Sequence, residues 1–165
     1  MRCRVLLVVV VAVLCVWLSE AVAGSLGAGI MVGEPTGLSF KQWVGRGHAM
    51  DLGVAWSFVD EGALHVHADY LFHRPGPPEI SMGGLLFYAG LGGRIKLEED
   101  KHGDTNNRVG VRLPLGVTYL FAQSHLDFFF EIAPLLDLAP ATDFGVNGAF
   151  GIRYYFGGRP HSRRI

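Results

Sequence analysis

The sequence predicts an all-β fold: an eight-stranded antiparallel up-and-down transmembrane β-barrel, preceded by a cleaved signal peptide. Three observations support this prediction. An apolar segment stands at the N-terminus, the later apolar residues alternate with polar ones, and the polar positions hold many glycines and few charges. Residues two apart on a strand point to the same face of a sheet, so this alternation gives each strand one apolar and one polar face.

The N-terminal segment has the three parts of a secretory signal peptide. Two arginines in MRCR precede the apolar run VLLVVVVAVLCVWL, and Ala21-Val22-Ala23 supplies a small-residue cleavage site. An uncleaved anchor helix is the alternative, but it would need about 20 apolar residues. We therefore expect three parts in the chain: a signal peptide over 1–23, a barrel over 24–156 and a basic tail over 157–165.

Composition excludes several classes of function. Cys3 and Cys15 both lie in the predicted signal peptide, so the exported chain would have no disulfide, zinc–thiolate site or cysteine nucleophile. A formal net charge of −1 argues against nucleic acid as a partner, because phosphate binding needs a concentrated basic surface. After the N-terminal segment, no apolar run is long enough to span a bilayer as a helix. A soluble core and a transmembrane barrel remain.

Alternation with a period of two defines the strands. In ALHVHADYLFH, apolar residues occupy the even positions from Leu64 to Phe72, while His65, His67 and Asp69 occupy odd positions. Most such runs reach the roughly 9–11 residues that a tilted strand needs to cross a bilayer. An even number of long strands joined by short turns is typical of an up-and-down barrel. The predicted strands are 25–33, 36–44, 47–58, 63–73, 82–97, 108–121, 125–136 and 144–156.

Two prolines fall inside predicted strands. Pro114 and Pro134 each remove a ladder donor, and a closed barrel has no free edge on which to place them. We therefore expect a β-bulge at each proline. Four apolar residues also fall on the nominally polar faces: Leu71, Leu86, Leu120 and Phe129.

The bulky apolar faces favour a membrane barrel over a soluble one. A soluble barrel of the lipocalin type would place its apolar set inside, around an apolar ligand, and would carry many lysines and glutamates outside. A membrane barrel reverses this arrangement and has aromatic girdles at its two interfaces. We predict the membrane arrangement, with these interfacial aromatic residues: Trp56, Phe58, Tyr70, Phe72, Tyr119, Phe121, Tyr154 and Phe156.

The opposite faces predict a filled, salt-bridged lumen. The interior of an eight-stranded barrel is just wide enough for side chains to fill, and buried charges must pair because an unpaired one is costly. We therefore expect no conducting pore. The predicted lumen polar network is Asp51, His65, His67, Asp69, Arg94, Arg112, Asp127, Glu131 and Arg153.

The last strand resembles the closing-strand signal that the bacterial barrel-assembly machinery reads. In FGIRYYF, alternate residues from Phe150 to Phe156 are apolar or aromatic up to the strand end, although GGRPHSRRI follows. More broadly, GEPTGLSFKQWV, HADYLFH, RVGVRLPLGVTYLF and GIRYYFG look like segments of an uncharacterised bacterial outer-membrane β-barrel family, similar in architecture to the small OmpA/OmpX-type barrels. The resemblance covers nearly all of the chain after the signal. It implies a location in the outer membrane of a diderm bacterium, with outer-membrane lipid and the assembly machinery as partners.

The two histidines of HVHAD pose the question of a metal site. His65-x-His67 on a strand is a metal-ligand spacing, and a third ligand could come from Asp51 on the adjacent strand or from His125 on a later one. Histidines inside a polar barrel also hydrogen-bond with carboxylates without any metal. We therefore predict no metal and no other cofactor.

A lipid-modifying barrel enzyme is the catalytic alternative. It would need a serine activated by a histidine and oriented by an acid, placed at the barrel rim or facing lipid. Ser57, Ser81 and Ser124 are the candidate nucleophiles, and His125 directly follows Ser124. Adjacent residues on a strand point in opposite directions, so this pair is poorly placed. No catalytic residues are predicted.

These observations predict a non-enzymatic outer-membrane barrel with a structural role or a role in surface interactions through its outer loops, whose ligand the sequence does not identify. The two alternatives are a secreted soluble barrel that binds an apolar ligand and a lipid-modifying barrel enzyme. The buried face of each strand distinguishes the first alternative, and a serine–histidine–acid cluster at the rim would indicate the second.

Overall fold

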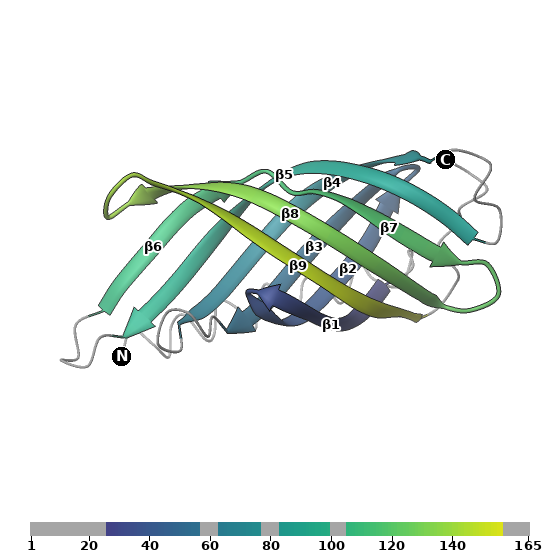
Figure 1. The fold of residues 1–165 in the computed structure, drawn as a ribbon, viewed down its shortest axis with the longest axis horizontal. Coiled ribbons are helices and arrows are strands. Elements are labelled where there is room, and N and C mark those ends of the chain that lie inside the picture. The colour runs from purple at the N-terminus through teal and green to yellow at the C-terminus, as the bar shows by residue number, and fades with distance from the viewer. Residues whose placement is uncertain (1–25, 57–62, 77–82, 100–104, 157–165) are drawn as a thin grey trace.

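The computed structural model describes residues 26–56, 63–76, 83–99 and 105–156, and its strands form one antiparallel sheet that closes on itself (Figure 1). The predicted signal peptide, the basic tail and Phe58 lie outside the described residues. The strands are β1 (Leu26–Glu34), β2 (Thr36–Gly45), β3 (His48–Trp56), β4 (Leu64–Pro75), β5 (Gly83–Glu99), β6 (Thr105–Arg112), β7 (Leu115–Phe121), β8 (Leu126–Ala139) and β9 (Asp143–Phe156).

The nine described strands occupy eight positions around the ring. Strands that are neighbours in the chain pair with each other, except that β6 and β7 do not pair and instead both lie between β5 and β8; β9 pairs with β1. β6 and β7 are therefore the two parts of the predicted strand 108–121. The predicted antiparallel up-and-down arrangement is confirmed, and the predicted and described strand bounds agree within three residues. None of the described residues forms a helix long and apolar enough to cross a membrane.

The β-bulges expected at the two prolines are absent. Gly92 pairs with Arg112 before Pro114, and Ala89 pairs with Leu115 after it, so the register on β5 is continuous. Pro134 likewise pairs in register with Val146. The Pro114 carbonyl accepts a hydrogen bond from the Gly90 amide (2.8 Å), and the Pro134 carbonyl accepts one from the Leu113 amide (2.9 Å).

Each proline therefore removes one backbone hydrogen-bond donor from the sheet without shifting the register. The prediction of bulges at these positions is wrong. The register shifts of the described strands fall elsewhere. One lies between Trp43 and Gly45, beside the β2–β3 turn in which Gly47 has a positive φ of 72°, and another lies between Val109 and Gly110.

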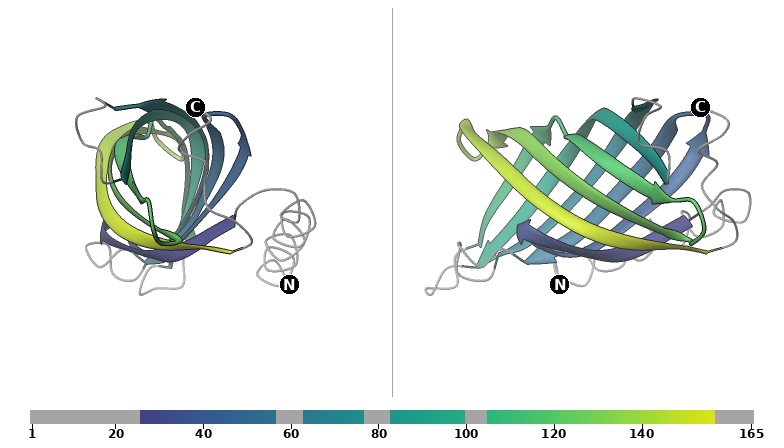
Figure 2. Two further views of the ribbon diagram at one scale, coloured as in Figure 1. Left: turned by 90° about the vertical axis from the view of Figure 1, so that its right-hand side faces the viewer. Right: turned by 45° about the vertical axis from the view of Figure 1, so that its right-hand side comes forward.

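The register fixes how steeply the strands cross the barrel. A path that steps from each residue to its partner on the next strand, once around the ring, returns to β9 ten residues from its start. In a ring of eight positions, a stagger of this size corresponds to strands tilted by about 35–45°, and the slope is visible in the right-hand view of Figure 2. The path runs through Tyr155, Gly27, Lys41, Asp51, Asp69, Gly92, Arg112, Leu135 and Gly145.

The barrel has two distinct ends. We call the end at which β1 begins and β9 finishes the terminal end; it also carries the turns at residues 46–47 and 122–125. The other end, at which β3, β5 and β8 finish, is the loop end. The left-hand view of Figure 2 looks along the barrel and shows the strands arranged as a ring.

Apolar side chains cover the outside of this barrel. Along β9 and β4, exposed and buried residues alternate, and the exposed ones are mainly large and hydrophobic. The same holds around the ring, where Ile30, Phe87, Phe128 and Ile152 are each at least 40% exposed. The inward positions hold most of the buried charges, so the polarity of an ordinary soluble barrel is reversed.

Close approach of backbones explains some inward glycines, and Gly29 offers a test. A Cβ at this position would lie 2.6 Å from the Arg153 Cα on β9. We expect Gly29→Ala to lower the free energy of unfolding by about 1–3 kcal/mol, because backbone atoms must move to admit the methyl group. Gly93→Ala, on the outward face of β5, is the control: its Cβ would lie 3.7 Å from the Gly110 carbonyl oxygen, so little change is expected. Chemical denaturation of the refolded barrel measures both, and equal effects would contradict the packing argument.

Candidate functional site

The lumen of the barrel contains an ion-paired network. Ten charged side chains are buried among the described residues, five acidic and five basic: Asp51, Asp69, Asp127, Glu131, Asp137, Lys41, Arg94, Lys96, Arg112 and Arg153. The seven charged residues predicted for the lumen are all among them, and the predicted His65 and His67 are also buried. Equal numbers of the two signs limit the cost of keeping these groups away from water.

Arg153, on β9, connects one side of the lumen with the other. Its guanidinium donates hydrogen bonds to Asp127 on β8 (3.0 Å) and to Asp51 on β3 (2.6 Å). It also lies over the ring of Phe129, 4.0 Å from the centroid, in a cation–π contact. Asp127 in turn accepts a hydrogen bond from the Tyr155 hydroxyl (2.7 Å). We call these residues the Arg153 cluster.

Arg112 forms a second cluster toward the middle of the barrel. Its guanidinium hydrogen-bonds to Glu131, which also accepts a hydrogen bond from the Tyr88 hydroxyl (2.9 Å). The Arg112 Nε lies 3.3 Å from Asp69 Oδ2, in an ion pair that does not meet hydrogen-bond geometry. Asp69 is therefore attracted to Arg112 electrostatically but accepts no hydrogen bond from it.

Two further pairs complete the network. Near the loop end, Arg94 forms a bidentate salt bridge with Asp137, with nitrogen–oxygen distances of 2.9 and 2.5 Å. A bidentate salt bridge gives both carboxylate oxygens a hydrogen bond at once. Near the terminal end, Lys41 Nζ lies 2.7 Å from His73 Nε2 and 5.0 Å from the ring centroid of Tyr88.

Apolar and aromatic side chains close the lumen at the terminal end. Leu86, Leu120 and Tyr155 form one buried cluster, and Trp43 packs against it. Trp43 also packs against a second cluster of Ala49, Leu71 and Tyr88. The apolar exceptions noted on the polar faces, Leu71, Leu86, Leu120 and Phe129, are therefore all buried inside the barrel.

The aromatic residues predicted for the interfaces lie on the outside of the barrel, apart from Phe58, which is outside the described residues. Tyr70–Phe72, Tyr119–Phe121 and Tyr154–Phe156 form three edge-to-face pairs with centroid distances of 5.1, 5.0 and 5.2 Å. Because β4, β7 and β9 all finish at the terminal end, the three pairs lie around the same end of the barrel. Trp56, which is 48% exposed, lies at the loop end, where β3 finishes.

The sequence prediction missed four lumen residues with acidic or basic side chains. Lys41, His73, Lys96 and Asp137 are all buried. The last three continue the phase of inward residues that the prediction identified, whereas no inward residue was predicted on the strand of Lys41. Asp137 follows Asp127 and Glu131 at even intervals, but it lies one residue beyond the predicted strand end. Lys96 similarly follows Arg94. Extending each phase to the strand end would have found both.

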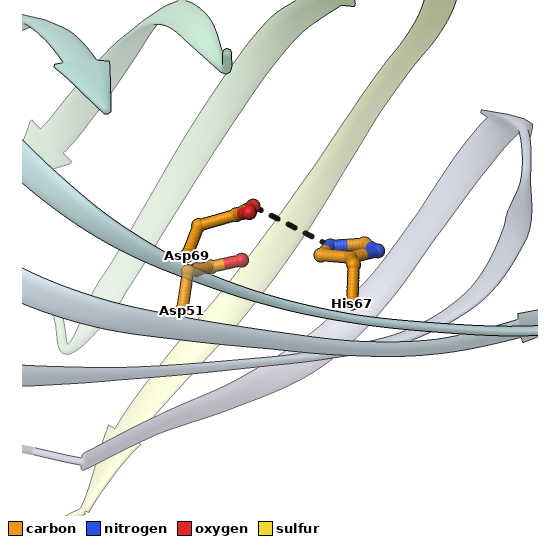
Figure 3. Close-up of side chains that lie close together, drawn as sticks. All are labelled: Asp51, His67 and Asp69. Atoms are coloured by element: carbon orange, nitrogen blue, oxygen red, sulfur yellow. Dashed lines mark ion pairs between the residues drawn. The ribbon is translucent and has the colours of Figure 1, made fainter. Parts of the chain in front are cut away.

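Three side chains gather in the lumen without satisfying one another. Asp51, His67 and Asp69 each offer a possible ligand atom, and these atoms lie within 4.8 Å of one another (Figure 3). His65 and His125, considered above as partners in a metal site, are not part of this group. Instead, the His65 ring packs edge to face against His67, and the His125 ring packs against Tyr154 on the outside.

The described residues contain no hydrogen-bonded serine–histidine–carboxylate set. Ser124 lies in the β7–β8 turn, where its amide donates a hydrogen bond to the Phe121 carbonyl (3.3 Å). The other two candidate nucleophiles, Ser57 and Ser81, lie outside the described residues. Ser39, which the sequence did not single out, accepts a hydrogen bond from Arg153 in the lumen (3.3 Å).

Comparison with protein families matches residues 18–159 to a family described as "Protein of unknown function (DUF3996)". The chain belongs to the DUF3996 family. Among solved structures, the DUF3996 chain is similar to the N-terminal β-barrel domain of OprF from Pseudomonas aeruginosa, with a TM-score of 0.59 and 13% sequence identity. The match covers 81% of this chain and 96% of the OprF domain. At this identity the likeness establishes the barrel fold. No curated protein matches the sequence.

Proposed function

We propose that this DUF3996 protein is a non-enzymatic outer-membrane β-barrel of a diderm bacterium, with a structural role or a role in surface interactions. In this proposal the N-terminal segment directs export, the barrel-assembly machinery inserts the chain, and outer-membrane lipid surrounds it. The loop end faces the outside, and its connections are the parts available to a surface ligand. The similarity to the OprF barrel domain supports the location.

The reversed polarity of the barrel carries this proposal. The outer surface exposes large apolar side chains on every strand from β1 to β9, and Leu113 continues this face between β6 and β7. Water would solvate such a surface poorly, whereas lipid matches it. A soluble barrel that holds an apolar ligand needs the opposite arrangement, and its lumen would not contain ten charged groups.

A filled lumen supports a structural role over conduction. The Arg153 cluster links β9 to β3, three positions away around the ring, and the Arg112 cluster links β6 to β8 and β4. The apolar clusters around Trp43 lie between these two clusters and the terminal end. An ion entering the lumen would have to displace charge-assisted hydrogen bonds and then pass an apolar layer. We therefore propose that the barrel does not conduct.

Heat-modifiable mobility on a detergent gel tests the location and the fold together. Closed membrane barrels remain folded in detergent until boiled, so an outer-membrane fraction should contain a species whose mobility changes after boiling. The soluble periplasmic fraction from the same cells is the control and should lack it. Recovery of the protein in the soluble fraction, with unchanged mobility after boiling, would contradict the proposal and favour the soluble barrel.

A further inference from the structure

We propose that Asp51, His67 and Asp69 bind a divalent transition-metal ion, such as zinc, inside the barrel. Asp51 lies on β3, and His67 and Asp69 lie on β4, directly beside it (Figure 3). The strands are adjacent and all three side chains point inward, so their possible ligand atoms come within 4.8 Å of one another. One imidazole and two carboxylates are a donor set that suits zinc and related ions.

The two carboxylates face each other in the sheet. Asp51 and Asp69 are register partners on β3 and β4, and like charges placed directly opposite on a strand pair repel each other. A cation between them would remove this repulsion. The neighbouring His67 supplies a nitrogen ligand, and its Nε2 lies 4.0 Å from Asp69 Oδ2.

Unsatisfied polar atoms point to a ligand at this position. Both carboxylate oxygens of Asp69 lack a hydrogen-bond partner, although this residue is only 4% exposed. Buried polar groups in proteins are nearly always hydrogen-bonded or bound to an ion or water. A metal ion would satisfy the Asp69 oxygens that Arg112 approaches but does not hydrogen-bond.

The balance of charges around the three residues favours a bound cation. Arg94 is the register partner of His67 but is neutralised by its own pair with Asp137, and Lys96 lies closer to the loop end, beside His65. The other buried charges form a group of four acids and three bases: Asp51, Asp69, Asp127, Glu131, Lys41, Arg112 and Arg153. This part of the lumen therefore carries an excess of one negative charge among the described residues.

The existing contacts permit the metal to bind. Asp51 gives one oxygen, Oδ1, to Arg153, and a carboxylate can hold an arginine and a metal ion with its two oxygens. Metal–ligand distances are about 2.0–2.2 Å, so ligand atoms around one ion lie closer together than 4.8 Å, and small side-chain rotations must bring them in. Glycine at position 53 accommodates the His67 ring, which occupies the volume that a Cβ there would fill.

Cobalt binding to the full-length protein tests the site. Co²⁺ replaces zinc in such sites and absorbs visible light when bound to nitrogen and carboxylate ligands. Because the site is buried, Co²⁺ is added while the protein refolds in detergent, and excess is removed before the spectrum is recorded. We expect one Co²⁺ per chain, displaced by Zn²⁺. A folded protein without cobalt absorption would overturn the proposal and indicate that water satisfies Asp69.

Two variants and a matched control identify the ligands. His67→Ala and Asp69→Asn should each weaken Co²⁺ binding by roughly 100-fold or more, since each removes a direct ligand. His65→Ala is the control, because His65 lies two residues away on the same face of β4 but outside the group. It should bind Co²⁺ as the unaltered protein does. Heat-modifiable mobility verifies folding of each variant, and an equal loss in His65→Ala would contradict the proposed ligand set.

Discussion

Replacement of Arg153 by alanine is expected to lower the free energy of unfolding by about 3–5 kcal/mol, the typical cost of removing one partner from a buried ion pair. Arg153 is 2% exposed and pairs with both Asp51 and Asp127. Without Arg153, the carboxylates of Asp51 and Asp127 remain buried but lose this ion pair. Lys41, the register partner of Asp51, is then the nearest base on the register path. The loss arises from these uncompensated charges as well as from the missing hydrogen bonds.

Equilibrium unfolding of the refolded barrel in lipid vesicles, followed by tryptophan fluorescence, measures this change. The control is Arg108→Ala at the loop end. Its ion pair with Asp143 is long, at 3.9 Å, and both side chains are partly exposed, so a loss of about 1 kcal/mol or less is expected. Equal losses in the two variants would show that burial of the Arg153 cluster does not determine stability.

The strands and their inward faces could be predicted from sequence because they depend on local alternation. A period of two assigns each residue of a strand to one of the two faces. Shifting the register of a strand by one residue would turn its whole apolar set into the lumen. β4 shows this most clearly: inward His65, His67 and Asp69 alternate with an apolar outward set. The division of one strand into β6 and β7 was not predicted. A proline always removes one backbone donor, but whether the strand is interrupted there depends on which carbonyl groups of the neighbouring strands lose a hydrogen bond.

The partners within the lumen could not be predicted from alternation. Arg153 and Asp51 lie 102 residues apart on strands that are not neighbours, and only the stagger of the barrel brings them to the same level. Gly27 and Gly29, two inward residues of β1, lie between the strands of Arg153 and Asp51. A Cβ at Gly27 would meet the Tyr155 ring, so the absence of a side chain on β1 lets residues of β9 reach across the lumen. The alternation places many glycines on the polar faces but does not show which side chains they make room for.

Phe150→Lys is expected to destabilise the barrel by about 2–4 kcal/mol in lipid, the cost of a lysine at the middle of a membrane. Phe150 lies near the centre of β9, is 47% exposed, and registers with Phe130 on one side and Val32 on the other. All three side chains are apolar and face outward. The expected loss arises because lipid cannot solvate the ammonium group, which must move toward the interface to reach water.

Phe144→Lys provides the control on the same strand, with the same residue type and the same change. Phe144 is the second residue of β9, at the loop end, and is 68% exposed. Near the interface a lysine costs only about 0–1 kcal/mol, so a membrane barrel should distinguish the two positions. Unfolding in lipid vesicles measures both variants. A soluble barrel would present Phe150 and Phe144 alike to water, so losses that are small and equal would show that the apolar outer surface of the DUF3996 barrel does not face lipid.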